Sequence, residues 1–82
     1  MRVPKDIGGR ELASLLVRYG YKVTRQTGSH MRLTTSINGE HHITIPEHKP
    51  LRIGTLNSIL NDISAHLEID KKSFIKELFE MR

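Results

Sequence analysis

The segment 26–33, Gln-Thr-Gly-Ser-His-Met-Arg-Leu, combines residue types that could act together on a phosphodiester. Gly28 can form a turn, His30 follows it at the expected start of a strand, and Arg32 comes two positions later. An imidazole can exchange a proton near neutral pH, and a guanidinium can bind a phosphate through two parallel hydrogen bonds. His30 is therefore either an acid–base group or a polar residue of a strand, and its position alone leaves both interpretations open.

The composition limits the class of protein and the kinds of site that the chain can form. The 82 residues, 37% of them hydrophobic and 27% charged, predict a single folded domain over residues 1–82. The chain has no cysteine, which excludes a disulfide framework, a thiolate nucleophile and a cysteine-ligated zinc ion. No stretch reaches the roughly 18 apolar residues of a membrane span, and the N-terminus lacks a signal-peptide pattern. We therefore expect a cytoplasmic protein.

The net charge of +4 is unevenly distributed along the chain. Residues 1–58 contain nine Lys and Arg against four Asp and Glu, whereas residues 59–82 contain four against five. A basic surface favours polyanionic partners such as nucleic acid, although a mildly basic, solvated surface has the same composition. The positive charge belongs to the part of the chain that carries His30.

One helix is expected before this segment. Four apolar residues at helical spacing predict it over residues 10–19: Leu12, Leu15, Leu16 and Tyr19. Gly9 is the expected N-cap, and Gly20 suits the left-handed residue that ends a helix.

Two further helices are expected after it. The first covers residues 54–64, and the second begins after an N-cap at Asp70 and covers residues 71–82. The buried side of the last helix is predicted to consist of Phe74, Ile75, Leu78 and Phe79.

Three strands are predicted between the first two helices, over residues 21–27, 31–37 and 41–45. Short loops join them, which makes an antiparallel meander. A three-residue loop at 37–39 sets Leu33 opposite Ile43 and Met31 opposite Ile45, and so keeps one face of the sheet apolar. A similar loop at 27–29 sets Val23 opposite Leu33.

This register places His30 on the face away from the apolar residues, with Arg32 beside it and Gln26 across from it. The same face receives Lys22, Thr24 and Thr44. Arg25 falls on the apolar side and fits the register badly. The predicted fold is α+β, with a three-stranded antiparallel sheet that has helices on one face and is open on the other, where His30 lies.

Five local features then occur in a recognisable order: a helix ending in Gly20-Tyr21, the turn Gly28-Ser29-His30, the hairpin Asn38-Gly39, the strand end Ile45-Pro46 and the helix start Gly54-Thr55-Leu56. Together they resemble the HicA family, small toxins of HicA–HicB toxin–antitoxin systems. The resemblance covers residues 8–64, and the helix at 70–81 looks like a C-terminal extension.

The resemblance implies an α-β-β-β-α fold like that of the double-stranded-RNA-binding domain, with an extra C-terminal helix. It also implies a ribonuclease that cleaves mRNA with one histidine, without metal or cofactor, and a HicB-like antitoxin that covers it. The family histidine follows the glycine of the first hairpin, which here is His30. We expect the RNA to be bound by Lys22, Gln26, Gly28, Ser29, Arg32 and Lys49. A non-catalytic RNA-binding module is the alternative.

Other assignments of the histidines are weaker. Ser29 and His30 are neighbours whose side chains point apart in an extended chain, so they do not form a nucleophile–base pair. His42 would lie roughly 13 Å from His30, too far to share one phosphate. His41 and His42 point to opposite faces, which argues against a zinc site. His48, in a loop, stays a candidate for a second catalytic histidine.

Overall fold

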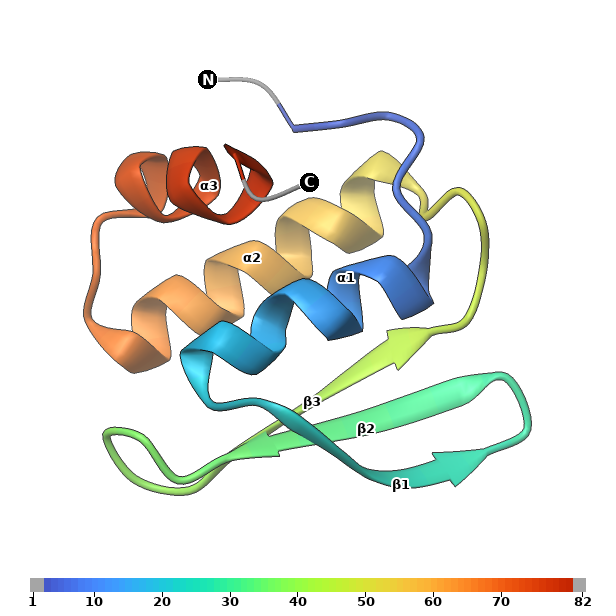
Figure 1. The fold of residues 1–82 in the computed structure, drawn as a ribbon, viewed down its shortest axis with the longest axis horizontal. Helices are drawn as coiled ribbons and strands as arrows, with labels where there is room; N and C mark the ends of the chain where they lie inside the picture. The colour runs from blue at the N-terminus through green and yellow to red at the C-terminus, as the bar shows by residue number, and fades with distance from the viewer. Residues whose placement is uncertain (1–2, 81–82) are drawn as a thin grey trace.

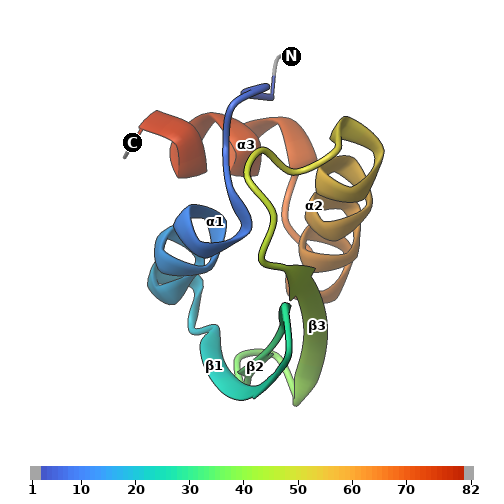
Figure 2. The ribbon, with the colours of Figure 1, turned by 90° about the vertical axis from the view of Figure 1, so that its right-hand side faces the viewer.

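Three helices lie on one side of a three-stranded sheet in the computed structural model, which describes residues 3–80. The elements follow in the order α1 (Gly9–Leu16), a 3-10 turn η1 (Val17–Tyr19), β1 (Lys22–Thr27), β2 (His30–Thr35), β3 (His41–Pro46), α2 (Ile53–Leu67) and α3 (Lys71–Glu80). Helices α1 and α2 cover one face of the sheet, and α3 packs beyond them, so the layers run sheet, α1 with α2, then α3 (Figures 1 and 2). The predicted α+β class and element order are confirmed.

The start of α1 differs by one residue from the prediction. Gly8 is the N-cap, with an extended backbone at φ −92° and ψ 163°, and Gly9 is the first helical residue. A Cβ atom at Gly9 would lie only 2.0 Å from the carbonyl oxygen of Pro46, so α1 passes directly over the end of β3. At the other end, Gly20 has a left-handed φ of 83° and ends η1, as predicted.

The pairing of β2 with β3 follows the predicted register. Leu33 lies opposite Ile43, and Met31 lies opposite Ile45. All four side chains are buried beneath the helices. The connecting loop is longer than the predicted three residues, because the strands end at Thr35 and resume at His41.

The pairing of β1 with β2 contains a bulge that the sequence did not predict. Val23 lies opposite Leu33 as expected, but the turn has two residues rather than three, and Thr27 pairs with His30. The register shifts between Val23 and Arg25, where β1 carries one extra residue. The expected pairing of Gln26 with His30 is therefore wrong: Gln26 lies opposite Met31.

The core lies between the sheet and the helices. Its most buried side chains come from every layer and include Leu12, Leu16, Tyr21, Met31, Leu33, Ile45, Leu56, Leu60, Ile63, Ile75 and Leu78. Helix α3 buries Phe74, Ile75 and Leu78, as predicted, and Phe79 is partly buried against the same cluster. Asp70 caps α3 by accepting a hydrogen bond of 2.9 Å from the backbone N–H of Ser73, which lowers its pKa. Within the described residues, no helix is long and apolar enough to cross a membrane.

Candidate functional site

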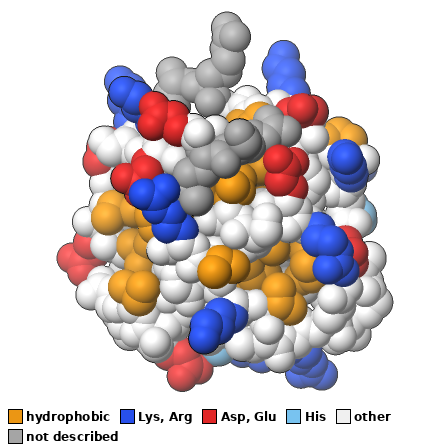
Figure 3. Space-filling model, viewed as in Figure 1, with side chains coloured by type: hydrophobic (Ala, Val, Ile, Leu, Met, Phe, Trp, Pro, Cys, Tyr) orange, Lys and Arg blue, Asp and Glu red, His pale blue; other side chains and the backbone are white. Residues whose placement is uncertain are grey.

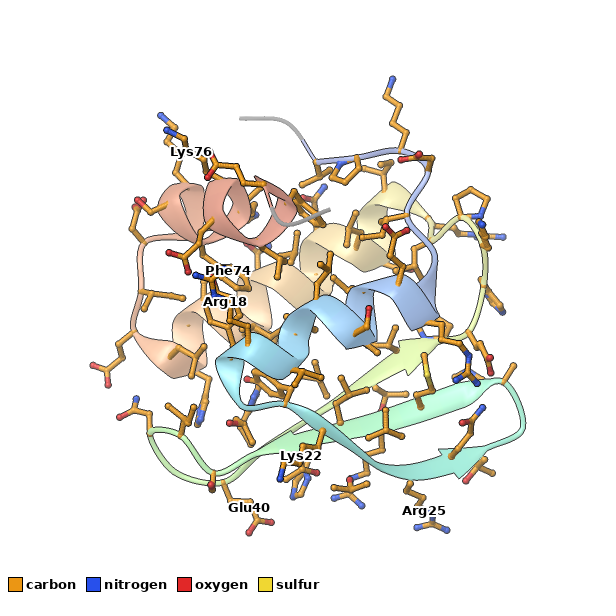
Figure 4. The ribbon with its side chains drawn as sticks, viewed as in Figure 1. Arg18, Lys22, Arg25, Glu40, Phe74 and Lys76 are labelled. Carbon is orange, nitrogen blue, oxygen red and sulfur yellow. The ribbon has the colours of Figure 1, made fainter. Side chains whose placement is uncertain are left out.

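The open face of the sheet carries exposed polar and basic side chains. Along β2, residues alternate between buried and exposed, so His30 and Arg32 project away from the helices. Lys22 and Arg25 of β1 also point away from the helices in Figure 4. In Figure 3, basic side chains lie along the lower margin of the molecule, on the side of the strands, together with an acidic side chain. The predicted placement of His30 beside Arg32 on an open, basic face is confirmed.

His30 begins β2 and is exposed, between Thr27 of β1 and Pro46 of β3. Within residues 3–80 its ring has no hydrogen-bond or ion-pair partner. Because the ring is exposed, water satisfies its nitrogens, and they have no competing protein contact in the described residues. The imidazole of His30 is thus available to a substrate that approaches from the open face.

The turn before His30 is made by Gly28 and Ser29. Gly28 has a left-handed φ of 58°, which glycine adopts without steric strain. The carbonyl of Ser29 accepts a hydrogen bond of 2.6 Å from the backbone N–H of Glu47, just past the end of β3. The backbone next to His30 is therefore held by a neighbouring strand.

Glu47 connects this end of the sheet to α1. Its carboxylate accepts hydrogen bonds from Arg10 Nε at 2.6 Å and from Gln26 Nε2 at 2.7 Å. The hydrogen bond from Arg10 is the largest cause that lowers the pKa of Glu47, so the group stays ionised at neutral pH. Because Glu47 binds both Gln26 and the backbone of Ser29, it fixes the hairpin end that carries His30.

The predicted RNA-binding residues do not all lie together. Gln26 is on the helix side of the sheet with Glu47, not on the face of His30. Lys49 and His48 line a surface hollow of about 330 Å³ beside the start of α1, next to Gly8. Lys22 is on the open face, but its partner Thr34 is four residues from His30, or roughly 13 Å along the strand. Only Arg32 and the turn residues adjoin His30.

A chain of hydrogen bonds occupies the other end of the open face. The hydroxyl of Thr24 lies 2.8 Å from that of Thr34, which lies 2.7 Å from His42 Nδ1. His42 Nε2 lies 2.7 Å from a carboxylate oxygen of Glu40. His42 pairs with Thr34, as predicted, and both of its ring nitrogens are already bound. Its position and its partners separate it from the site at His30.

A second hydrogen-bond network, on the helix side of the sheet, was not predicted from the sequence. The hydroxyl of Tyr21 lies 2.8 Å from His41 Nδ1, and His41 Nε2 lies 3.1 Å from Asp62. Burial, followed by the negative charge of Asp62, raises the pKa of Tyr21 to about 12. His41 and His42 thus project to opposite faces, as predicted.

The ring of His66 stacks on that of His41, with centroids 4.2 Å apart. His66 Nε2 lies 3.0 Å from the carbonyl oxygens of Ile37 and Gly39, so it donates to the loop between β2 and β3. His66 thus joins the last turn of α2 to the loop between β2 and β3. The residues that the structure describes contain no group of three His, Cys, Asp or Glu that could hold a metal ion.

Comparisons with known proteins identify a family for this chain. No curated protein and no solved structure matches the chain. One family model, described as the HicA toxin of bacterial toxin–antitoxin systems, matches residues 9–64. The match begins with α1, includes η1 and all three strands, and extends through most of α2, so it contains the whole open face and His30. The chain belongs to the HicA toxin family.

Proposed function

We propose that this HicA-family toxin is a metal-independent endoribonuclease that cleaves mRNA with His30 as its one catalytic histidine. The observation that carries the proposal is the free, exposed ring of His30 beside Arg32, on the basic face of the sheet. General-base catalysis needs a group within reach of the proton it removes, with a pKa close to the working pH. A histidine without a protein partner meets the first condition for a substrate on that face.

In this mechanism, His30 accepts the proton of a ribose 2′-hydroxyl, and the resulting oxyanion attacks the adjacent phosphorus. The bond from phosphorus to the 5′-oxygen breaks, and the products are a 2′,3′-cyclic phosphate and a 5′-hydroxyl. Water on the open face supplies the proton that the leaving oxygen takes up. The positive charge of Arg32, two residues along β2 from His30, stabilises the negative charge that develops on the non-bridging oxygens through its electrostatic field.

The test is incubation of the protein with single-stranded RNA in EDTA. Wild type should produce fragments with cyclic phosphate ends, and His30→Ala should produce none while keeping the same fold. His42→Ala is the matched control, because His42 lies on the same face at the other end and should leave cleavage intact. Cleavage by His30→Ala at the wild-type rate would refute the assignment. A gel shift without fragments would identify a non-catalytic RNA-binding module instead.

The nucleophile is tested separately by the substrate. An RNA with a single 2′-deoxy nucleotide on the 5′ side of the cut site should bind but not be cleaved there. Cleavage at that position would exclude attack by the 2′-hydroxyl.

We further propose a HicB-like antitoxin as the partner that inhibits the toxin in the cytoplasm. Covering the open face would block His30 without a change in the fold. Addition of the antitoxin should therefore abolish RNA cleavage, and His30→Ala should retain antitoxin binding, since only one exposed side chain is removed. Retention of full RNA cleavage in the complex would contradict inhibition by occlusion.

A further inference from the structure

We propose that Arg25 and Arg32 form a clamp for one phosphate of the RNA strand, next to the phosphate that is cut. The inference rests on the proposed function for the identity of the ligand, and it adds a residue, Arg25, that lies outside the predicted site. It also specifies what the clamp recognises: the backbone of a single strand rather than its bases.

The bulge in β1 creates the clamp. The shift between Val23 and Arg25 sets Arg25 directly opposite Arg32 across the strands. Thr24 is the extra residue, and its hydroxyl donates a hydrogen bond of 3.3 Å to the carbonyl oxygen of Arg32. Without the shift, strand alternation would turn Arg25 towards the helices. Instead Arg25 points outward, as Figure 4 shows, on the same face as Arg32.

Two like charges directly opposite each other on one sheet face destabilise the pairing of the strands. Neither guanidinium has an acidic partner within residues 3–80, and both side chains are exposed. A phosphate held between them would replace this repulsion with charge-assisted hydrogen bonds from both sides. The pairing of Arg25 with Arg32 therefore lowers the stability of the free protein and favours the binding of an anion, which is the pattern expected of a binding site.

The spacing relates the clamp to His30. Residues two apart on one strand lie roughly 6.6 Å apart on the same face, which separates Arg32 from His30 by about one step of an extended nucleotide chain. In the other direction, the hydrogen-bonded chain that ends at Glu40 places a carboxylate on the face. The favourable track for phosphates is therefore short, from His30 to the arginine pair, with Lys22 near its far end.

The described part of the open face offers phosphate-binding groups but no Phe or Tyr side chain for base stacking. Both tyrosines and Phe74 and Phe79 belong to the core or to the helix side. Without an aromatic platform, binding depends on charge, and its affinity should fall steeply with salt and vary little with base sequence. An acidic protein segment could bind the same cations, but the distance between His30 and Arg32 corresponds to the repeat of phosphates along an RNA strand and not to a feature of an acidic peptide.

Binding of a short single-stranded RNA is measured in the His30→Ala background, so that cleavage does not interfere. Arg25→Gln and Arg32→Gln should each weaken binding roughly fivefold to tenfold at low salt. Each should also reduce the slope of log K against log salt by about 0.7, the value for one phosphate contact on a single strand. Lys76→Gln is the matched control, since Lys76 lies on α3, away from the sheet, and loses the same charge (Figure 4).

An Arg25→Gln variant that binds RNA as tightly as the Lys76→Gln control, with the same salt slope, would overturn the clamp. A variant that loses antitoxin affinity while keeping RNA affinity would also overturn it and would assign the pair to protein docking. If both arginine variants weaken RNA binding but the wild-type protein binds RNA without cleaving it, the clamp is supported and the ribonuclease proposal is refuted. Failure of one proposal is thus distinguishable from failure of the other.

The free protein provides a second measurement. Because the two guanidiniums repel each other, Arg25→Gln should raise the melting temperature at low salt, and the gain should disappear in about 1 M salt. Removal of Arg25 should have no such effect once Arg32→Gln is already present. A melting temperature that is unchanged or lowered at low salt would contradict the repulsion on which the clamp depends.

Discussion

The carboxylate of Glu47 lies 2.6 Å from the guanidinium of Arg10, so the end of the sheet that carries His30 is bound to the start of α1. The same carboxylate accepts a hydrogen bond from Gln26, and the backbone N–H of Glu47 binds the carbonyl of Ser29. One residue therefore joins α1, β1 and the turn before β2. In the proposed mechanism, Glu47 would therefore act as a positioning residue, because it holds the backbone next to His30.

Replacement of Glu47 by Gln should lower kcat for RNA cleavage several-fold and change KM little. The neutral amide loses the ion pair with Arg10, so the hairpin end becomes less well fixed. Arg10→Gln should give a similar loss, and the double variant should be no worse than either single variant, because both remove the same contact. Glu80→Gln, at the end of α3, is the control for the loss of one acidic charge. Additive losses would show that Glu47 and Arg10 act independently.

Stability at acidic pH should report on Glu47 and Asp70. Both have a folded-state pKa below the ordinary values of 4.5 and 3.8, because of hydrogen bonds from Arg10 and from Ser73 respectively. A lowered pKa contributes stability that is present above the unfolded pKa and is lost as pH falls through the folded value. Urea unfolding should therefore show a decreasing free energy of unfolding below about pH 4.5. In Glu47→Gln the decrease should be smaller; an unchanged pH profile would contradict the lowered pKa.

Stability at alkaline pH should report on Tyr21. Its folded-state pKa of about 12 lies above the ordinary value of 10.0, so the neutral hydroxyl stabilises the fold. That contribution is complete below pH 10 and is lost as pH rises towards 12. Tyr21→Phe should cost about 1 kcal/mol at pH 8, because His41 loses its hydrogen-bond partner, and should reduce the decline in stability between pH 10 and 12. A decline equal to that of the wild type would assign the titration to Tyr19, whose pKa is also raised to about 12.

The β-bulge shows how far the sequence could predict this site. A three-residue turn, or a two-residue turn with one extra residue inside β1, gives the same pairing of Val23 with Leu33. Apolar alternation fixes the paired residues near the core, so it predicted the faces of His30 and Arg32 correctly. It does not locate the extra residue inside β1, and it placed Arg25 and Gln26 on the wrong faces of the sheet. The poor fit of Arg25 was the signal that the strand was irregular.

The contacts of Glu47 and of Tyr21 were not predictable in the same way. Glu47, just past the end of β3, contacts Arg10 of α1, and Tyr21, just before β1, contacts His41 of β3, which in turn contacts Asp62 of α2. These segments lie far apart in the sequence. Spacing along a single element predicts which face a side chain occupies, whereas such contacts depend on how whole elements pack. The fold class and element order, which follow from local patterns, were therefore predicted, and the support of the candidate site was not.

Gly9→Ala should destabilise the protein severely, by about 3 kcal/mol or more. A Cβ at this position would lie 2.0 Å from the carbonyl oxygen of Pro46. Because that oxygen belongs to the backbone, no side-chain rotation can relieve the clash. Separation of α1 from β3 would also strain the contact of Arg10 with Glu47, so RNA cleavage should fall with stability. Gly54→Ala is the matched control: it lies in the first turn of α2 with no atom within 4 Å of the added Cβ, and it should be neutral or stabilising by up to about 1 kcal/mol. Equal melting temperatures for the two variants would show that α1 does not require the close approach to β3.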